Sequence, residues 1–196
     1  MSDPNRLPGP RDVRTTLDGD TTDRIVVACS PHPQFGGDRH DSRLRAVSDA
    51  LVDRDIDCLR IDYGPWDEGR GERTDALTAL EWAGERYDTV ALFGYSFGGA
   101  VALSAAIEAD SLAAVSVLAP AASSVEGFDP ADLDAISCPA QVVYGERDDT
   151  ADWQSVVERA EQLEWSVESM PADHFFISQQ SRIGNLVRDF FAASLG

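Results

Sequence analysis

The stretch Thr89-Val90-Ala91-Leu92-Phe93-Gly94-Tyr95-Ser96-Phe97-Gly98-Gly99-Ala100 decides how this chain folds. Residues 89–93 form a short apolar run, typical of a strand buried on both faces. Residues 100–109 are small and favour a helix. A glycine stands two places before and two places after Ser96, where a bulky side chain would obstruct a tight strand-to-helix bend. We therefore predict a turn that presents the Ser96 hydroxyl above one edge of a sheet as a candidate nucleophile.

Strand and helix patterns alternate along the rest of the chain. Alternation of this kind predicts a three-layer α/β fold, with helices on both faces of a mostly parallel sheet. Strands are expected at residues 13–17, 24–29, 56–61, 89–93, 112–118, 140–144 and 166–169, and helices at residues 42–53, 74–86, 100–109, 152–163 and 181–193. The first two strands flank a turn at residues 18–20 and are expected to form a hairpin. We expect a single domain over residues 13–196, preceded by a flexible N-terminal segment, residues 1–12.

Acidic residues dominate the composition. The 196 residues include 35 acids and 16 bases, for a formal net charge of −19. All 16 bases are arginine, and aspartate outnumbers glutamate by 24 to 11. Such a charge makes nucleic acid an unexpected partner, and it is typical of halophiles such as haloarchaea, because molar salt shortens the Debye length to roughly 3 Å. The alternative is an ordinary solvated acidic surface.

Other compositional signals are weak. Residues 1–10 lack the apolar run of a signal peptide, and no apolar run approaches the roughly 18 residues of a membrane span, so we expect a cytoplasmic protein without a membrane partner. The cysteines, Cys29, Cys58 and Cys138, are widely spaced and are expected to be small apolar residues. We expect no metal and no cofactor. The sequence leaves monomer and homodimer open.

A serine hydroxyl becomes nucleophilic only when a base takes its proton and a third group orients that base. In sites built on a strand-turn-helix serine, the chain order is serine, acid, histidine. Only His174 follows Ser96, in a loop before the closing helix, so we predict that it is the base rather than a surface histidine. Four carboxylates follow the strand at residues 140–144, where ligands gather at the edge of a parallel sheet: Glu146, Asp148, Asp149 and Asp152. Asp148 is favoured and Asp149 is second, whereas Asp152 is expected to cap the next helix.

An oxyanion formed at this serine needs two backbone N–H donors. The first is expected from Phe97, directly after the serine. The second is expected from the loop Ser30-Pro31-His32-Pro33-Gln34-Phe35-Gly36-Gly37, whose prolines have no N–H to donate. We favour His32, with Gln34 second.

Taken together, these residues resemble the α/β-hydrolase superfamily, in particular the small lidless serine hydrolases related to dienelactone hydrolase. Their HPHPxxGG loop and GxSFG elbow match residues 30–37 and 94–98, and the resemblance extends over roughly residues 13–195. Asp148 matches the acid-bearing turn of the family. Two departures stand out: Ser30 replaces the first histidine of the loop, and residues 62–68 lack the usual arginine-glycine turn. The serine, where dienelactone hydrolases use cysteine, favours general ester chemistry.

The resemblance implies a two-step acyl transfer from a small ester or thioester, with an acyl-enzyme on Ser96. Residues 119–138 are too short for a large lid, so we expect an open apolar cleft that binds a small-molecule acyl substrate. Its expected substrate-binding residues are Tyr95, Phe35, Gln34, Phe175 and Trp66, although Phe175 could instead anchor its loop. The alternatives are an acyltransferase or amidase with the same triad, or a binding protein that keeps the fold without turnover.

The acidic composition predicts that the protein folds best in concentrated salt. The unfolding midpoint in 2 M KCl should exceed that in 0.1 M KCl by at least about 5 °C, roughly 1–2 kcal/mol for a chain of this size, because salt screens the self-repulsion. Differential scanning calorimetry measures this shift. Equal midpoints at both concentrations would remove the argument for a halophilic protein.

Overall fold

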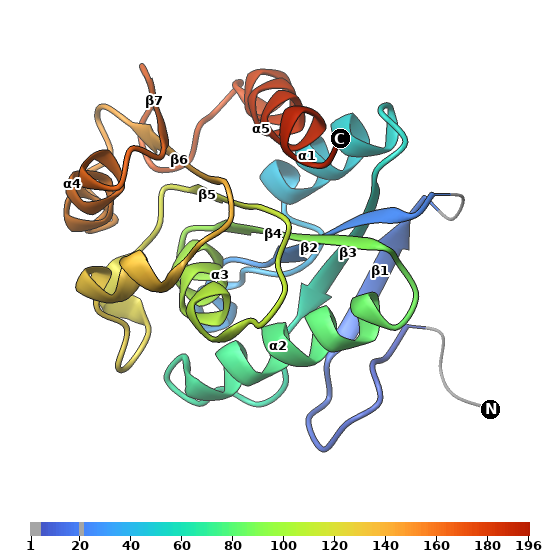
Figure 1. Cartoon of the computed structure of the whole chain (residues 1–196). Coiled ribbons are helices and arrows are strands. Elements are labelled where there is room, and N and C mark those ends of the chain that lie inside the picture. Colours follow the sequence, from blue (N-terminus) through green and yellow to red (C-terminus); the bar gives the residue numbers. More distant parts are fainter. Residues whose placement is uncertain (1–4, 20–21) are drawn as a thin grey trace.

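The computed structural model, which describes residues 5–19 and 22–196, contains one seven-stranded sheet (Figure 1). The strand order is β1-β3-β2-β4-β5-β6-β7, and every neighbouring pair is parallel except β1 with β3. The strands are β1 (Arg14–Asp18), β2 (Arg24–Cys29), β3 (Asp57–Asp62), β4 (Thr89–Tyr95), β5 (Val115–Leu118), β6 (Ala140–Gly145) and β7 (Ser166–Met170). The α-helices are α1 (Ser42–Val52), α2 (Arg70–Gly84), α3 (Phe97–Glu108), α4 (Gln154–Gln162) and α5 (Gln180–Ser194). The predicted three-layer α/β fold is confirmed.

The sheet separates two hydrophobic cores, because successive side chains of a strand point to opposite faces. In β2, Val26 and Ala28 belong to the core beneath α1 and α5, whereas Ile25 and Val27 belong to the core beneath α2, α3 and α4. Figure 1 shows α1 and α5 together on one side of the sheet and α2 and α3 on the other. Burial on both faces explains why the central strands are continuous apolar runs rather than alternating ones.

The predicted hairpin between the first two strands is wrong. Strand β1 pairs antiparallel with β3, while β2 lies between β3 and β4 and pairs in parallel with both. The physical reason is burial: the last five residues of β2 are buried, whereas Thr15 is the one buried residue of β1, which suits the edge of the sheet. Part of the predicted turn, residue 20, lies outside the described residues.

Three predicted helix starts also need correction, and one of them is that of α3, which begins at Phe97 rather than at residue 100. Helix α2 begins at Arg70 rather than at residue 74, because the Glu72 carboxylate accepts hydrogen bonds from the amides of Asp67 and Gly69 at 2.9 and 2.8 Å. Helix α4 begins at Gln154, and Asp152 does not cap it. Asp152 instead accepts a hydrogen bond from the Ser123 amide at 2.8 Å, and a local capping pattern cannot predict a contact with a distant segment.

Part of the N-terminal segment contacts the domain. Leu7 is buried in the core, and the Arg11 guanidinium donates to the buried Asp75 carboxylate at 2.7 Å and to the Pro65 carbonyl at 2.5 Å. Asp75 also accepts from the Gly64 amide at 2.8 Å. Residues 1–4 lie outside the described residues, and the flexibility of the segment stays a prediction.

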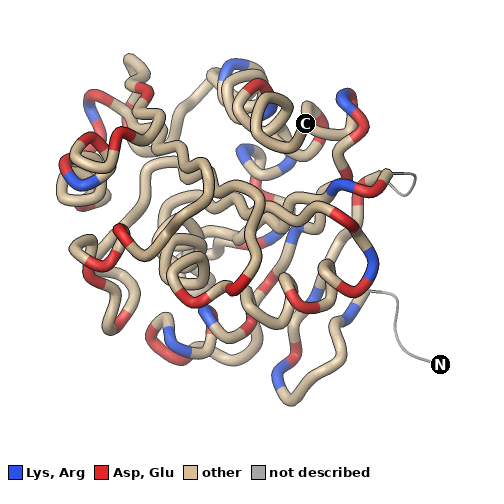
Figure 2. Tube along the Cα trace, in the orientation of Figure 1, with Lys and Arg blue, Asp and Glu red and all other residues tan. Residues whose placement is uncertain are grey.

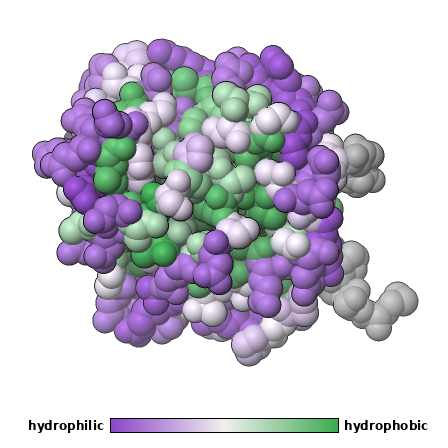
Figure 3. Space-filling model, viewed as in Figure 1, coloured by the Kyte–Doolittle hydropathy of each residue, from purple (hydrophilic) through white to green (hydrophobic). Residues whose placement is uncertain are grey.

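Charge and hydropathy divide the surface. Figure 2 shows acidic residues spread over the helices and loops, with the central strands almost free of charge. On the face seen in Figure 1, Figure 3 shows an apolar area near the labels β4, β5 and α3, surrounded by hydrophilic surface. Within the part of the chain that the structure describes, no helix has the length and apolar character needed to cross a membrane.

Replacing Arg11 should destabilise the fold. The Asp75 side chain is 1% exposed and that of Arg11 is 22% exposed, so Arg11→Ala would leave a carboxylate buried beside no cation and lower the free energy of unfolding by about 3 kcal/mol. Urea unfolding in high salt measures this. The control is Arg14→Ala. Among the described residues, the Arg14 side chain forms an exposed ion pair with Asp12 at 3.5 Å, so this substitution should change stability by less than about 0.5 kcal/mol. Equal effects of the two substitutions would contradict the prediction.

Candidate active site

Ser96 lies at the turn between β4 and α3, in a backbone conformation that non-glycine residues seldom adopt. Its φ and ψ are 58° and −119°. A Cβ added at Gly94 would lie 2.0 Å from the Gly98 carbonyl oxygen, and one at Gly98 would lie 2.2 Å from the Cys29 carbonyl oxygen. No side chain fits these spaces, so both glycines are required for the turn and for its contact with β2. The result is a half-buried hydroxyl at the carboxyl edge of the sheet.

The structure brings Ser96, His174 and Asp148 into one hydrogen-bonded chain. Ser96 Oγ is 2.9 Å from His174 Nε2, and His174 Nδ1 is 2.8 Å from Asp148 Oδ2. The other Asp148 oxygen accepts from the amides of Thr150 and Ala151 at 2.9 and 3.0 Å. Asp148 and His174 are buried, whereas the alternative acid, Asp149, is exposed. This order of hydrogen bonds is the one that a serine nucleophile, a base and an orienting carboxylate would require.

The loop that carries His174 lies against the turn that carries Asp148. Gly145, the last residue of β6, makes this approach possible, because a Cβ there would lie 2.6 Å from the Ala172 carbonyl oxygen. The Arg147 amide donates to the same carbonyl at 3.0 Å. Asp148 and His174 are therefore positioned by backbone contacts between their two segments, which are adjacent only in space.

Tyr95 and Arg43 hold the other side of the His174 loop. The Tyr95 hydroxyl donates to the His174 carbonyl at 2.9 Å, and its ring stacks on the imidazole with centroids 5.5 Å apart. Burial raises the pKa of the Tyr95 phenol, which keeps its proton on the oxygen as a donor. The Arg43 guanidinium lies 4.6 Å from the centre of the Tyr95 ring and donates to the Phe175 carbonyl at 3.1 Å. The predicted substrate-binding residue Tyr95 is thus 2% exposed and fastens the loop.

His32 is packed between aromatic rings. Its centroid lies 4.5, 4.6 and 4.8 Å from those of Phe35, Trp66 and Phe97. Burial lowers the pKa of the imidazole, and its Nδ1 accepts from the Gln34 amide at 3.3 Å, which places the proton of the neutral ring on Nε2. The Gln34 amide, our second choice as oxyanion donor, is therefore engaged. Within the described residues, the amides of His32 and Phe97 donate no hydrogen bond.

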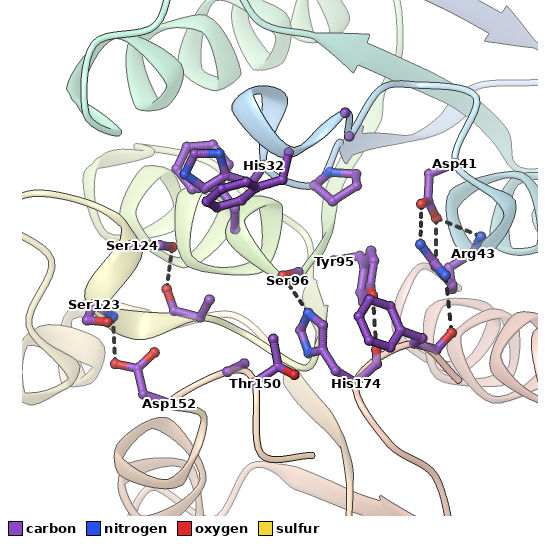
Figure 4. A pocket seen from close by; sticks show the side chains of 18 residues that line it. His32, Asp41, Arg43, Tyr95, Ser96, Ser123, Ser124, Thr150, Asp152 and His174 are labelled. Atoms are coloured by element: carbon purple, nitrogen blue, oxygen red, sulfur yellow. Dashed lines mark hydrogen bonds and ion pairs between the residues drawn. The ribbon is translucent and has the colours of Figure 1, made fainter. Parts of the chain in front are cut away.

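A cavity of about 460 Å³ opens above Ser96. Three of the predicted substrate-binding residues line it: Tyr95, which is buried, and Phe35 and Phe175, which are 86% and 51% exposed. The other two, Trp66 and Gln34, do not line it: the ring of Trp66 packs against His32, and Gln34 is exposed to solvent. The sequence interpretation missed polar residues that line the cavity, although several follow strands at the edge where such groups gather: Asp41, Arg43, Ser123, Ser124, Thr150 and Asp152. Figure 4 shows these side chains around Ser96.

The cavity lies where the sheet topology favours a site. Strand β2 leads to α1 on one face and β4 leads to α3 on the other, so the loops after these two adjacent strands diverge. Ligands of open α/β sheets bind at such switch points. Within residues 5–19 and 22–196, no group of three or more His, Cys, Asp or Glu side chains is arranged to hold a metal ion.

A family profile described as the dienelactone hydrolase family matches residues 62–189. The chain belongs to the dienelactone hydrolase family. Solved structures agree with this assignment. An α/β serine hydrolase homologue from Coxiella burnetii is 25% identical, with a TM-score of 0.81 over 96% of this chain and 97% of that one. An α/β serine hydrolase without a lid from Xanthomonas campestris is also 25% identical, with a TM-score of 0.76 over 95% of this chain and 92% of that one.

More distant structures share the fold. Est1E from Butyrivibrio proteoclasticus is 16% identical, with a TM-score of 0.81 over 96% of this chain and 97% of that one. No curated protein sequence is significantly similar to this dienelactone hydrolase family member. The family and its structural relatives identify the protein as an enzyme with the α/β-hydrolase fold, a hydrolase.

Removing the Tyr95 hydroxyl should slow the enzyme without unfolding it. Tyr95→Phe deletes the hydrogen bond to the His174 carbonyl, worth about 1 kcal/mol, so kcat/KM for an activated ester should fall roughly fivefold. Steady-state kinetics and the unfolding midpoint measure both effects. The control is Tyr144→Phe, because Tyr144 stacks on Trp153 on the opposite face of the sheet and should leave kcat/KM unchanged. If kcat/KM is unchanged in Tyr95→Phe, the Tyr95 hydroxyl does not help to position His174.

Proposed function

We propose that this member of the dienelactone hydrolase family is a serine hydrolase that cleaves a small ester or thioester through an acyl-enzyme on Ser96. One observation carries the proposal: the Ser96 hydroxyl, the His174 imidazole and the Asp148 carboxylate are joined at 2.9 and 2.8 Å. A binding protein has no need of all three groups in this order. The open cavity above the hydroxyl supports access by a substrate carbonyl.

The proposed reaction begins as His174 Nε2 takes the proton of the Ser96 hydroxyl while the oxygen attacks the carbonyl carbon. The imidazolium then donates this proton to the leaving alcohol or thiol. Water, deprotonated by the same imidazole, releases the acyl group and restores the serine. Asp148 accepts the proton of Nδ1 in a hydrogen bond, and its negative charge stabilises the imidazolium. Two backbone amides bond to its second oxygen and fix the orientation of the carboxylate.

The amides of Phe97 and His32 are proposed to stabilise the negative oxygen of the tetrahedral intermediate. The Phe97 amide is the first of α3, where the helix dipole favours negative charge. The rings around His32 and the bond from Gln34 to its Nδ1 keep the backbone of this loop in place before substrate arrives. Donors fixed in advance need no reorganisation as charge develops, which supports their use in this role.

The cavity supports a small substrate with an apolar part. Between β5 and β6 the chain forms only two short 3-10 helices, Ala122–Ser124 and Pro130–Ala135, in place of a lid. Phe35 and Phe175 provide exposed aromatic surface at the cavity. One solved structure with this fold, 17% identical with a TM-score of 0.82, is described as ferulic acid bound to Est1E, so aryl esters belong among the first substrates to test.

We place this activity in the cytoplasm of a halophile. The net charge of −19 would be screened in a salt-rich cytoplasm, and it disfavours nucleic acid and anionic membrane surfaces as partners. The proposed partner is therefore a small-molecule acyl substrate.

Covalent labelling tests the nucleophile. In 2 M KCl the protein should react with a fluorophosphonate probe at Ser96, and Ser96→Ala should remain unlabelled and lose p-nitrophenyl ester hydrolysis by on the order of 10⁴-fold or more. Esters of increasing acyl length and aryl esters then define the substrate. A folded parent protein that fails to label would refute the proposed serine chemistry.

The acid is tested by a pair of adjacent substitutions. Asp148→Asn removes the charge beside His174 Nδ1 and favours the wrong tautomer, so kcat should fall by on the order of 10³- to 10⁴-fold. Asp149→Asn is the matched control, since the Asp149 side chain is exposed, and it should change kcat by less than about twofold. The reverse result would make Asp149 the orienting acid.

A further inference from the structure

One end of the cavity is polar, and no step of the proposed reaction uses it. In Figure 4, Ser123, Thr150 and Asp152 lie to one side of Ser96, and Asp41 and Arg43 lie to the other. The first group comes from the segment after β5 and the turn after β6. These two segments are joined at 2.8 Å by a hydrogen bond from the Ser123 amide to Asp152 Oδ2.

The carboxylates that line or border the cavity differ in how their charge is balanced. Asp41 forms an ion pair with Arg43, and Asp148 is hydrogen-bonded to His174 and to two amides. Asp152 has no such partner, because no basic nitrogen of the described residues lies within 4.0 Å of its carboxylate. Its Oδ1 and the hydroxyls of Ser123 and Thr150 make no hydrogen bond within that part of the chain. The polar end therefore offers unused acceptors and one uncompensated negative charge.

The position of Asp152 requires an explanation beyond its local sequence. It precedes α4 by two residues, yet it does not cap the helix, whose N-cap residue is Trp153. The carboxylate instead lies at the cavity, where it is exposed to solvent. Hydrogen bonds to a charged acceptor are about twice as strong as those between neutral groups, so a donor that reaches this carboxylate would be preferred over an apolar group of the same shape.

We propose that Asp152, with the hydroxyls of Ser123 and Thr150, selects substrates in which one half carries a hydrogen-bond-donating or cationic group, a hydroxyl or an ammonium, and disfavours carboxylates. This inference rests on the proposed function and names the substrate class of the same cavity. The aromatic surface of Phe35 and Phe175 then contacts the apolar remainder of the substrate. Asp152 acts on specificity only, because its carboxylate takes no part in the bonds made or broken.

The test compares matched esters that differ only in this group. Glycerol 1-butanoate is paired with propyl butanoate, and choline butanoate with its neutral isostere 3,3-dimethylbutyl butanoate. Two further pairs place the group in the acyl half: ethyl 3-hydroxybutanoate with ethyl butanoate, and betaine ethyl ester with ethyl 3,3-dimethylbutanoate. The glycerol and hydroxybutanoate arms report a hydroxyl, and the choline and betaine arms report a cation.

The variant is Asp152→Asn, which keeps an oxygen to accept from the Ser123 amide but removes the charge. For each pair, kcat/KM for the hydroxyl or cationic ester is divided by kcat/KM for its plain counterpart. In at least one pair, this ratio should be roughly three- to tenfold lower for Asp152→Asn than for the parent. The intrinsic reactivity of each ester cancels in this comparison, since both proteins act on the same compounds. Where an ester turns over too slowly, its affinity is measured instead by how well it protects Ser96 from the fluorophosphonate probe. The affinities of the two esters of a pair then give the ratio.

Asp149→Asn is the control for general charge, because Asp149 is an exposed acid in the same turn that does not line the cavity. It should leave every ratio unchanged. Ratios that are equal in the parent and Asp152→Asn, or that change equally in Asp149→Asn, would overturn the inference. A parent that does not label with the fluorophosphonate would instead count against the proposed function, so the two failures are distinguishable.

Discussion

The backbone of Ser96 is the constraint on which the rest of the site depends. A non-glycine residue with a φ of 58° and a ψ of −119° is strained, at a cost of about 1–3 kcal/mol. The conformation persists because β4 ends at Tyr95 and α3 begins at Phe97, and both elements are fixed by burial on either side of Ser96. Gly94 and Gly98 also permit backbone contacts that no side chain would allow. The stability of the two cores thus maintains one half-buried hydroxyl in a fixed direction.

Around this hydroxyl, each loop is held by a different set of contacts. The His174 loop is fastened by the Tyr95 phenol and the Arg43 guanidinium, and the Asp148 turn is held by its own amides. The His32 loop is kept in place by aromatic packing and by one bond to its Nδ1. The His174 loop and the Asp148 turn also bond to each other, but a cavity side chain that bonds to neither Ser96, His174 nor Asp148 can change while these three residues keep their positions. The polar end at Asp152 is an example of such a loop-borne feature.

Much of the fold and of the central site could be predicted from local patterns. Continuous apolar runs located the central strands, because strands buried on both faces have no alternation. The pairing of β1 could not be predicted, since a turn between residues 18 and 20 is compatible with a hairpin and with a crossing to β3. The start of α2 was missed for a related reason: Glu72 caps it through amides of a preceding loop whose course is set by packing.

The sequence by itself determined the strand-turn-helix at Ser96, the limited choice of base and acid, and the strong acidic surface, because these depend on residue type, spacing and chain order. Only the tertiary structure brought the carboxylate of Asp148, rather than that of Asp149, to within hydrogen-bond distance of His174, removed Trp66 and Gln34 from the cavity wall, and placed Asp152 and Ser123 within it. Those outcomes depend on distances between residues far apart in the chain. Such distances are set by how the two cores pack against the sheet, which no local pattern records.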